Sequence, residues 1–259
     1  MNIGSYLNIP LFTISLGKLE FKPGLFPTLV TLVFLYLLIS LGQWQLDRAE
    51  YKTNIENLVK ERKDLPPIVL NMAPAGIDER MYLPVKTHGT FDSNHQIFLD
   101  NRVVKHQAGY DVYTPLLREN APALLVKRGW VKMGRTRQNL PDINIDNVYT
   151  DIAGILNKPP SHGLILSDNA NQYQQWPALA QFIDLDEIES ILGYPLYPMI
   201  LVLDGQHESA LHQQPIAMNM NSAKHHGYAF QWFALATTLT IIYLVVNTKR
   251  GNRKNDRAS

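Results

Sequence analysis

Two long uncharged apolar segments flank a central region of different character. No charged residue occurs between Lys22 and Asp47, or between His226 and Lys249. Each segment is long enough for a helix that crosses the hydrocarbon core, which needs about 20 residues. We predict transmembrane helices at 25–46 and 225–247. The first begins after more than twenty residues and lacks a small-x-small cleavage site, so we interpret it as a retained anchor and not as a signal peptide.

The region between the two segments changes from a helical to a β-rich pattern. The residues that recur at steps of three and four are Trp44, Arg48, Tyr51, Ile55, Leu58 and Arg62. A helical extension that ends before Pro66 is predicted over 47–64, because no Gly or Pro intervenes there. Short β-rich runs separated by turn residues follow it, and a single helix is predicted at 184–192, closed by Gly193. Candidate strands are 81–88, 95–99, 110–117, 123–132, 148–156, 164–166 and 198–203, with Gly129 indicating a bulge.

This pattern predicts an α+β protein in which two transmembrane helices flank a mainly antiparallel-β domain, as a sheet or partly closed barrel. The expected parts are a tail (1–24), the first span (25–46), its extension (47–64), the β domain (65–224), the second span (225–247) and a basic tail (248–259). Five cations and one aspartate follow the second span. The positive-inside rule therefore predicts that both termini are cytoplasmic and that the β domain is periplasmic, in a bacterial inner membrane.

Composition excludes several kinds of chemistry. The net charge of +1 gives no electrostatic footprint for nucleic acid, and the 259 residues include no cysteine. Disulfides, thiolate zinc sites, iron–sulfur clusters and C-x-x-C-H haem attachment are thereby excluded. The sequence contains no nucleophile elbow, phosphate-binding loop or H-E-x-x-H motif, and we expect no enzyme and no resident metal.

Histidines beside the second span are the candidate ligands. On a helix, His225, Tyr228 and Trp232 form one stripe at the membrane interface. This stripe is either an aromatic belt with an interfacial histidine or a haem or metal site, since imidazole binds iron and copper. His226 diverges from His225 by about 100°, so both cannot bind one iron.

Two other features leave alternatives open. Gln231 is an amide one turn inside the membrane, and Ala234 and Thr238 offer small residues on a related face, so this helix packs either on the first span or on a foreign subunit. A loop with imidazoles and thioethers could bind Cu(I). Its members are His207, His212, Met218, Met220, His225 and His226.

Four motifs, in order, resemble the Surfeit-locus family of cytochrome oxidase assembly factors in its bacterial form. They are LGQWQLDR at 41–48 followed by Lys52, GYDVYTP at 109–115, LVKRGWV at 125–131 and KHHGYAFQWF at 224–233. The resemblance extends along nearly the whole chain. It marks Trp44, Arg48, Gly109, Tyr110, Arg128, Gly129 and Trp130 as family-defining positions.

The resemblance implies a non-enzymatic function. Such a protein assists the assembly of cytochrome c oxidase, a haem-copper terminal oxidase, while haem a is delivered to or inserted into the catalytic subunit. It implies haem a binding through His225 with Tyr228 and Trp232, with His226 as the alternative ligand. The implied partners are oxidase subunits, chiefly the haem-bearing one, the lipid bilayer and a haem a synthesis enzyme. A scaffold without haem and a Cu(I) carrier are the alternatives.

Overall fold

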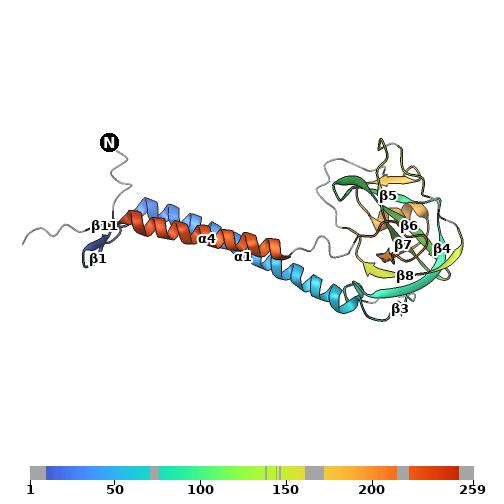
Figure 1. The fold of residues 1–259 in the computed structure, drawn as a ribbon, viewed down its shortest axis with the longest axis horizontal. Coiled ribbons are helices and arrows are strands. Elements are labelled where there is room, and N and C mark those ends of the chain that lie inside the picture. The colour runs from blue at the N-terminus through green and yellow to red at the C-terminus, as the bar shows by residue number, and fades with distance from the viewer. Residues whose placement is uncertain are drawn as a thin grey trace, which may run out of the picture. The chain divides into compact units, whose positions relative to one another are not determined.

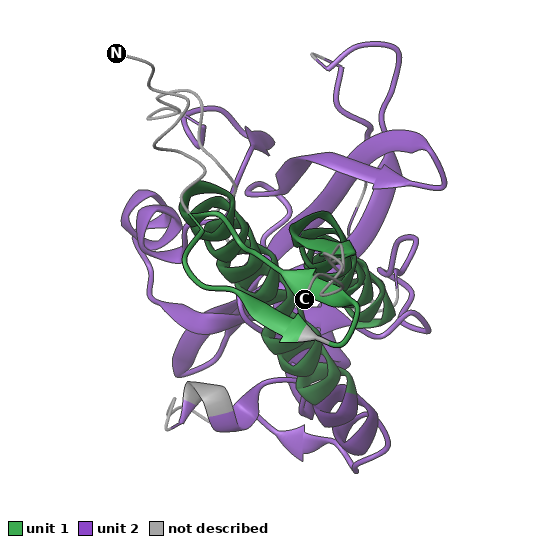
Figure 2. Ribbon diagram, turned by 90° about the vertical axis from the view of Figure 1, so that its left-hand side faces the viewer, with its two compact units in different colours: residues 1–56, 219–259 green, residues 57–218 purple. Residues whose placement is uncertain are grey.

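The computed structural model describes residues 10–70, 76–137, 139–143, 145, 147–160, 172–214 and 222–250. The chain divides into two compact units, 1–56 with 219–259 and 57–218, which Figure 2 colours separately. The first unit contains both apolar helices and a small sheet. The second contains the β domain, which begins inside the last turns of the first helix.

Two antiparallel helices build the first unit. Helix α1 runs uninterrupted over Leu25–Arg62 and α4 over Ser222–Asn247. Only 6% and 11% of their most apolar stretches is buried. Such exposed apolar faces differ from those of core helices in soluble proteins and are typical of helices in lipid, where each helix satisfies its own backbone. The chain is therefore a membrane protein with two spans.

A seven-residue repeat of less exposed positions forms the contact between the helices, which we name the seam. On α1 the seam comprises Thr28, Thr31, Leu35, Leu38, Gly42, Gln45, Ala49, Lys52 and Glu56, and on α4 it comprises Ser222, His225, Ala229, Trp232, Ala236, Leu239 and Tyr243. Such a repeat is that of a coiled coil. Gly42, Ala49, Ala229 and Ala236 are the buried members, and small residues let helix backbones approach closely.

Hydrogen bonds accompany the seam at both ends. The hydroxyls of Thr28 and Tyr243 lie 2.7 Å apart, and the hydroxyl of Ser222 donates to Glu56 at 3.2 Å. Near the middle of α1, a Cβ at Gly42 would lie 2.7 Å from the ring of Phe233, so only glycine fits there without a shift. These contacts fix one register for the pair.

A three-stranded antiparallel sheet lies across one end of the helix pair (Figures 1 and 2). Its strands are β1 (Ile14–Leu16), β2 (Leu19–Phe21) and β11 (Thr248–Arg250), with β2 in the centre. Strand β2 lies just before α1, and β11 directly follows α4. The hydrophobic pattern predicted tails here, because strands of three residues give no periodic signal.

The second unit is a mixed sheet that closes on itself. Strand order is β3-β4-β8-β10-β7-β6-β5-β9, and a further pairing of β4 with β6 closes a ring of five strands. The ring comprises β4 (Pro84–Phe91), β8 (Tyr149–Asn157), β10 (Leu196–Leu203), β7 (Ala121–Lys132) and β6 (Gln107–Arg118). All its pairs are antiparallel except β10 with β7. The predicted partly closed barrel is therefore a closed one.

Apolar side chains fill the barrel and cover one flank of it. The interior cluster contains Val85, Phe91, Leu116, Leu124, Val126, Ile152, Leu156, Tyr197, Met199, Leu201 and Leu203. A second cluster packs helix α3 (Leu185–Leu192) and β9 (Ala178–Ala180) beside β5 (Ile97–Val104). Strand β6 is buried on both faces along most of its length, so its burial is continuous and does not alternate from residue to residue.

In the second unit the predicted elements match the observed ones closely, with three omissions. Helix α3 has the predicted start, since Asp184 accepts from the amides of Asp186 and Glu187, and Gly193 ends it at φ 72°. Six predicted strands correspond to β4, β5, β6, β7, β8 and β10, and 164–166 lies outside the described residues. Strand β3 (Ile68–Val69), β9 and the short helix α2 (Ile77–Arg80) were missed because such short elements carry no period.

Phe91 tests the closure of the barrel. It pairs with Leu116 where β4 meets β6, and it is 1% exposed within the interior cluster. We expect Phe91→Ala to lower the free energy of unfolding by about 3–5 kcal/mol, because it removes a buried ring and leaves a cavity. Denaturant titration of the whole protein in detergent, followed by near-ultraviolet circular dichroism, measures this change.

The matched control is Val103→Ala on β5, where the side chain is 66% exposed. Its effect should stay within about 0.5 kcal/mol. Equal effects of the two substitutions would show that the β4–β6 pairing does not hold the barrel together.

Candidate functional site

The candidate ligand His225 lies on the seam and is held by a glutamine. Its Nδ1 lies 2.7 Å from the Oε1 of Gln45 on α1. An amide oxygen only accepts, so this pairing places the single proton of the neutral imidazole on Nδ1. The lone pair then resides on Nε2. A histidine that ligates a metal has this arrangement, in which one ring nitrogen donates and the other remains free to coordinate.

The predicted stripe on α4 divides between two faces. His225 and Trp232 are seven residues apart and half-buried on the seam, whereas Tyr228 is 51% exposed beside it. His226, the alternative ligand, is exposed. The structure therefore gives His225 a partner from α1 and places His226 on a different face of the helix.

The residues of α1 near Gln45 occupy two faces as well. Lys52 lies on the seam two turns after Gln45, whereas Trp44 and Arg48 are exposed. The guanidinium of Arg48 lies over the ring of Tyr51 at 5.4 Å. Positive charge is thus available within two helical turns of His225's partner.

Gln231, Ala234 and Thr238 do not contribute to the helix pair. All three are exposed, while the buried small residues of α4 are Ala229 and Ala236. Of the two alternatives for this face, packing on α1 is wrong. An amide at this depth on a lipid-exposed face remains available to another membrane helix.

Two of the family motifs meet on neighbouring strands of the barrel. Strands β6 and β7 pair Gly109 with Lys132 and Asp111 with Trp130. A side chain at Gly109 would collide with the indole of Trp130, so the ring lies directly against the glycine. The indole Nε1 donates to the carbonyl of Arg102 at 3.0 Å. These positions thus form a single packing unit.

Arg128 and Gly129 attach the segment that leads towards α4. The side chain of Arg128 is 2% exposed, and its Nε donates to the carbonyl of Ser209 at 2.9 Å. Its own carbonyl accepts from the amide of Leu211 at 2.8 Å. Burial lowers the pKa of Arg128 to about 10, so it remains charged at neutral pH. This charge inside the domain is matched to the carbonyl of Ser209 and the side-chain oxygen of Gln96.

The predicted bulge at Gly129 allows this attachment. The β6–β7 register shifts between Val112 and Tyr113, and Gly129 has φ 134°. A Cβ there would lie 2.8 Å from the backbone of Leu211. The amide of Trp130 next donates to the carbonyl of His212 at 2.8 Å. Glycine is needed because the returning backbone occupies the place of a side chain.

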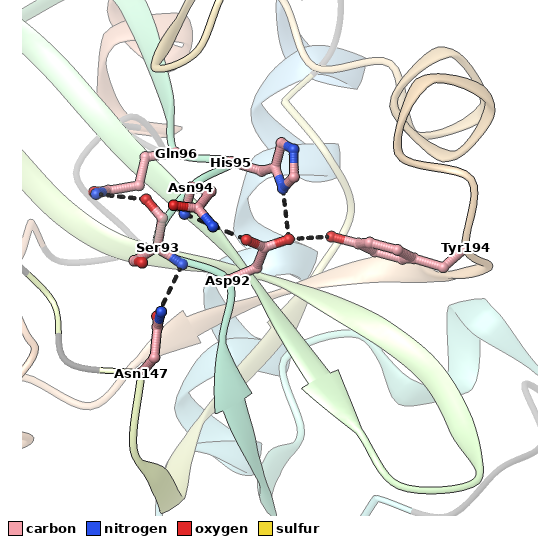
Figure 3. A network of polar contacts seen from close by, with 7 residues as sticks. All are labelled: Asp92, Ser93, Asn94, His95, Gln96, Asn147 and Tyr194. Carbon is pink, nitrogen blue, oxygen red and sulfur yellow. Dashed lines mark hydrogen bonds and ion pairs between the residues drawn. The ribbon is translucent and has the colours of Figure 1, made fainter.

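An aspartate-centred network fixes the turn between β4 and β5 (Figure 3). The Oδ2 of Asp92 lies 2.6 Å from Nδ1 of His95 and accepts from the hydroxyl of Tyr194 at 3.0 Å. Burial and the charge of Asp92 raise the pKa of Tyr194, which keeps its hydroxyl as a donor. Gln96 in the same turn accepts from Arg128 at 3.3 Å. The network therefore connects the turn to β7 and to the start of β10.

The histidines of the proposed copper loop take part in local contacts. In His207, Nδ1 accepts from the amide of Ser209 at 3.1 Å, and Nε2 lies 3.4 Å from the hydroxyl of Thr150. The ring of His212 packs against Trp130. Met218 and Met220 lie outside the described residues. Among the residues that are described, no three His, Asp or Glu side chains cluster closely enough to hold a metal.

Gln45 is the candidate site residue that sequence reasoning missed. It stands within the motif at 41–48, but only its neighbours Trp44 and Arg48 were selected. The available signal was its place in the repeat, three residues after Gly42 and four before Ala49. A polar side chain between two small residues on a packed helix face indicates a partner across the interface.

Two packed apolar helices and a closed five-stranded barrel define a membrane-anchored barrel protein of the α+β class. The chain belongs to the SURF1 family, whose sequence profile matches residues 32–237. It is 30% identical to a SURF1-like protein of Rickettsia conorii over 215 residues, covering 81% of this chain and 86% of the relative. With the human Surfeit locus protein 1 it shares 20% identity over 224 residues, covering 79% and 72%.

A yeast relative carries a functional name. The chain is 28% identical over 122 residues to the cytochrome oxidase assembly protein SHY1 of Saccharomyces cerevisiae, which covers 44% of this chain and 31% of the yeast protein. The chain therefore belongs to the SURF1 family and has two apolar helices long enough to span a membrane.

The contact of Gly109 with Trp130 yields a stability prediction. Gly109→Ala places a methyl group against the indole and the carbonyl of Val131. We expect the free energy of unfolding to fall by about 1–3 kcal/mol, which is typical of overpacking. The control Gly134→Ala meets only the carbonyl of Asn139, at 3.2 Å, and should change stability by less than about 0.5 kcal/mol. If both variants unfold at the same denaturant concentration, the Gly109 packing unit does not contribute to stability.

Proposed function

We propose that this protein assists the assembly of cytochrome oxidase in a bacterial inner membrane, by holding haem a before its transfer to the catalytic subunit. Membership of the SURF1 family and the name of the yeast relative support the assembly function. The single observation that carries the haem function is the 2.7 Å contact between His225 and Gln45. Both termini are then cytoplasmic, and the barrel is periplasmic.

The residues around His225 fit an amphipathic haem. Iron requires a neutral imidazole with a free nitrogen. Gln45 favours the tautomer with Nε2 free, because its side-chain oxygen accepts a hydrogen bond from Nδ1–H. The macrocycle and its hydrophobic tail require apolar contact, and Tyr228 and Trp232 lie on the same helix beyond the ligand. Arg48 and Lys52 follow Gln45 on α1 and supply positive charge suited to propionates.

A single protein ligand matches the task of transfer. Of the two neighbouring histidines, only His225 has an orienting partner on α1, and His226 points to another face. One axial bond gives an affinity that the receiving subunit can exceed, whereas a site with two protein ligands would retain its cargo. The bound haem supplies its iron, its apolar surface and its propionates to these contacts.

Helix α4 of this protein offers a surface on which the receiving subunit can dock. Gln231, Ala234 and Thr238 form an exposed face that α1 leaves uncovered. Small residues and an amide at membrane depth favour helix packing with an interhelical hydrogen bond. We assign this face to the haem-bearing oxidase subunit, with a haem a synthesis enzyme as the donor partner.

His225→Ala tests haem custody. Protein purified from cells that synthesise haem a should lose its haem, because the substitution removes the axial ligand while leaving the buried alanine contacts of the seam intact. The haem content per protein, read from the reduced absorbance spectrum, measures this loss. His226→Ala is the matched control and should retain haem.

The same variants test the wider assembly function in a strain that lacks the protein. Wild type and His226→Ala should restore the a-type band in the redox difference spectrum of membranes, and His225→Ala should not. Full restoration by His225→Ala would overturn haem custody and leave a scaffold. An a-type band and oxidase activity that remain normal in the empty strain, with no related protein present, would overturn the assembly function itself.

Gln45 provides a second test of the ligand. Gln45→Leu removes the acceptor of the Nδ1 proton, and we expect haem affinity to fall about tenfold, since partners that orient a ligand typically contribute that much. Gln45→Glu keeps an acceptor and makes the imidazole more basic, so affinity should be retained and the reduction potential of the bound haem should fall. Haem titration and redox titration of the purified variants measure both quantities.

An unchanged potential in Gln45→Glu, together with unchanged affinity in Gln45→Leu, would show that Gln45 does not act on the ligand. Gln43→Leu is the matched control, because Gln43 is exposed on α1 and donates to Asp47 within the same helix.

A further inference from the structure

The small sheet at the end of the helix pair has one apolar and one polar face. Its register aligns Ile14 with Phe21 and Ser15 with Glu20. Successive strand residues point to opposite faces, so Ile14, Leu19 and Phe21 share one face. Ser15, Glu20 and Lys249 share the other, since Lys249 pairs with Glu20, whereas Arg250 pairs with Leu19 and lies at the edge of the apolar face.

The apolar face is turned towards the helices. Phe21 packs edge-on against Tyr243 of α4, with ring centroids 6.0 Å apart, and also contacts Phe12. Helix α4 crosses the bilayer in this interpretation. The sheet face that is turned towards α4 is therefore turned towards the lipid. The polar face then points away from the membrane into water.

The described residues leave this apolar face largely uncovered. Phe12, Ile14 and Leu19 are each about half exposed, at 49%, 48% and 48%. The helix surfaces that continue from it are also exposed and apolar, as expected for lipid contact. The sheet therefore extends the lipid-facing surface of the helix pair sideways at its end.

Cations surround the edge of the sheet. Lys18 lies in the turn between β1 and β2, and Lys249 and Arg250 lie on β11; all three are exposed. Lys22 is paired with Glu20 at 2.6 Å. Basic side chains beside apolar ones are suited to the boundary between acyl chains and anionic headgroups, where the stems remain apolar and the charges reach the phosphates.

We propose that β1, β2 and β11 form an interfacial platform that lies on the membrane surface and binds anionic phospholipid headgroups. The backbone supports this placement, because the amide of Lys22 donates to the carbonyl of Asn247 at 2.8 Å. That bond joins the start of one span to the end of the other at the bilayer surface. The platform thereby holds both spans together and sets their depth.

Site-directed spin labelling tests the platform, and the absence of cysteine from the 259-residue chain makes single labels unambiguous. Leu19→Cys labels the apolar face, Ser15→Cys the polar face, and Val103→Cys on the barrel is the water reference. The full protein is reconstituted in phosphatidylcholine vesicles with and without phosphatidylglycerol. Collision rates with oxygen and with a water-soluble nickel chelate report the depth of each label.

We expect the Leu19 label to collide mainly with oxygen, and the Ser15 and Val103 labels mainly with the nickel chelate. Equal nickel accessibility at Leu19 and Ser15 would overturn the proposal, because both faces would then lie in water. A Leu19 label shielded from both reagents would also overturn it and would indicate a covering protein. None of these readouts involves haem, so they are independent of the proposed function.

The headgroup preference is tested by removing charge. In wild type, phosphatidylglycerol should move the Leu19 label deeper, and the combined Lys18→Gln, Lys249→Gln and Arg250→Gln variant should lose that shift. The matched variant Lys105→Gln, on the barrel, should keep it. A depth that does not respond to phosphatidylglycerol in wild type would overturn recognition of anionic lipid.

Discussion

Close packing of two helices at glycine and alanine is the contact on which the other features of the first unit depend. In lipid there is little hydrophobic gain from joining helices, so the association relies on close approach and on a few polar contacts. Gly42 and Ala49 on α1 and Ala229 on α4 allow that approach. At this separation the side chain of Gln45 reaches His225, and the strands at the helix ends pair with one another. A larger residue in the seam would therefore alter the ligand and the sheet together.

The barrel applies a different constraint, in which strand pairing and burial act together. Closure by β4 and β6 leaves the five ring strands without a free edge inside the ring, and it creates one continuous interior core. The Arg128-Gly129-Trp130 segment then binds residues 209–213 to β7 by hydrogen bonds. The Arg128-Gly129-Trp130 motif therefore binds the segment that precedes α4 in the sequence. Its side chains contact backbone carbonyls and rings, which agrees with a function in the fold.

The membrane site and the barrel thus divide the tasks. A haem-handling site at the end of two helices requires one oriented imidazole, nearby cations and an uncovered helix face, and all of these come from the first unit. Buried charged residues of the second unit have partners inside that unit: Arg128 donates to the carbonyl of Ser209, and the Oδ2 of Asp111 pairs with Lys127 at 2.8 Å. The chemistry proposed for the protein therefore depends on few side chains of the first unit. The side chains named in the second unit stabilise its fold.

The sequence by itself determined the two spans, helix α3, the five barrel strands with β5 beside them, and the bulge at Gly129, because each depends on local composition or on a period of 2 or 3.6 residues. It also marked His225 as the candidate ligand, through a motif at the start of the second span that resembles the Surfeit-locus family, and this assignment stays a prediction. Only the tertiary structure decided that β4 closes on β6, that Gly109 packs under Trp130, and that Gln45 orients His225 across 180 positions of chain. The physical reason is that a hydrophobic pattern shows which face of an element is buried but not what covers it. Short strands such as β2 and β11 exist only because the helix pair brings their backbones together.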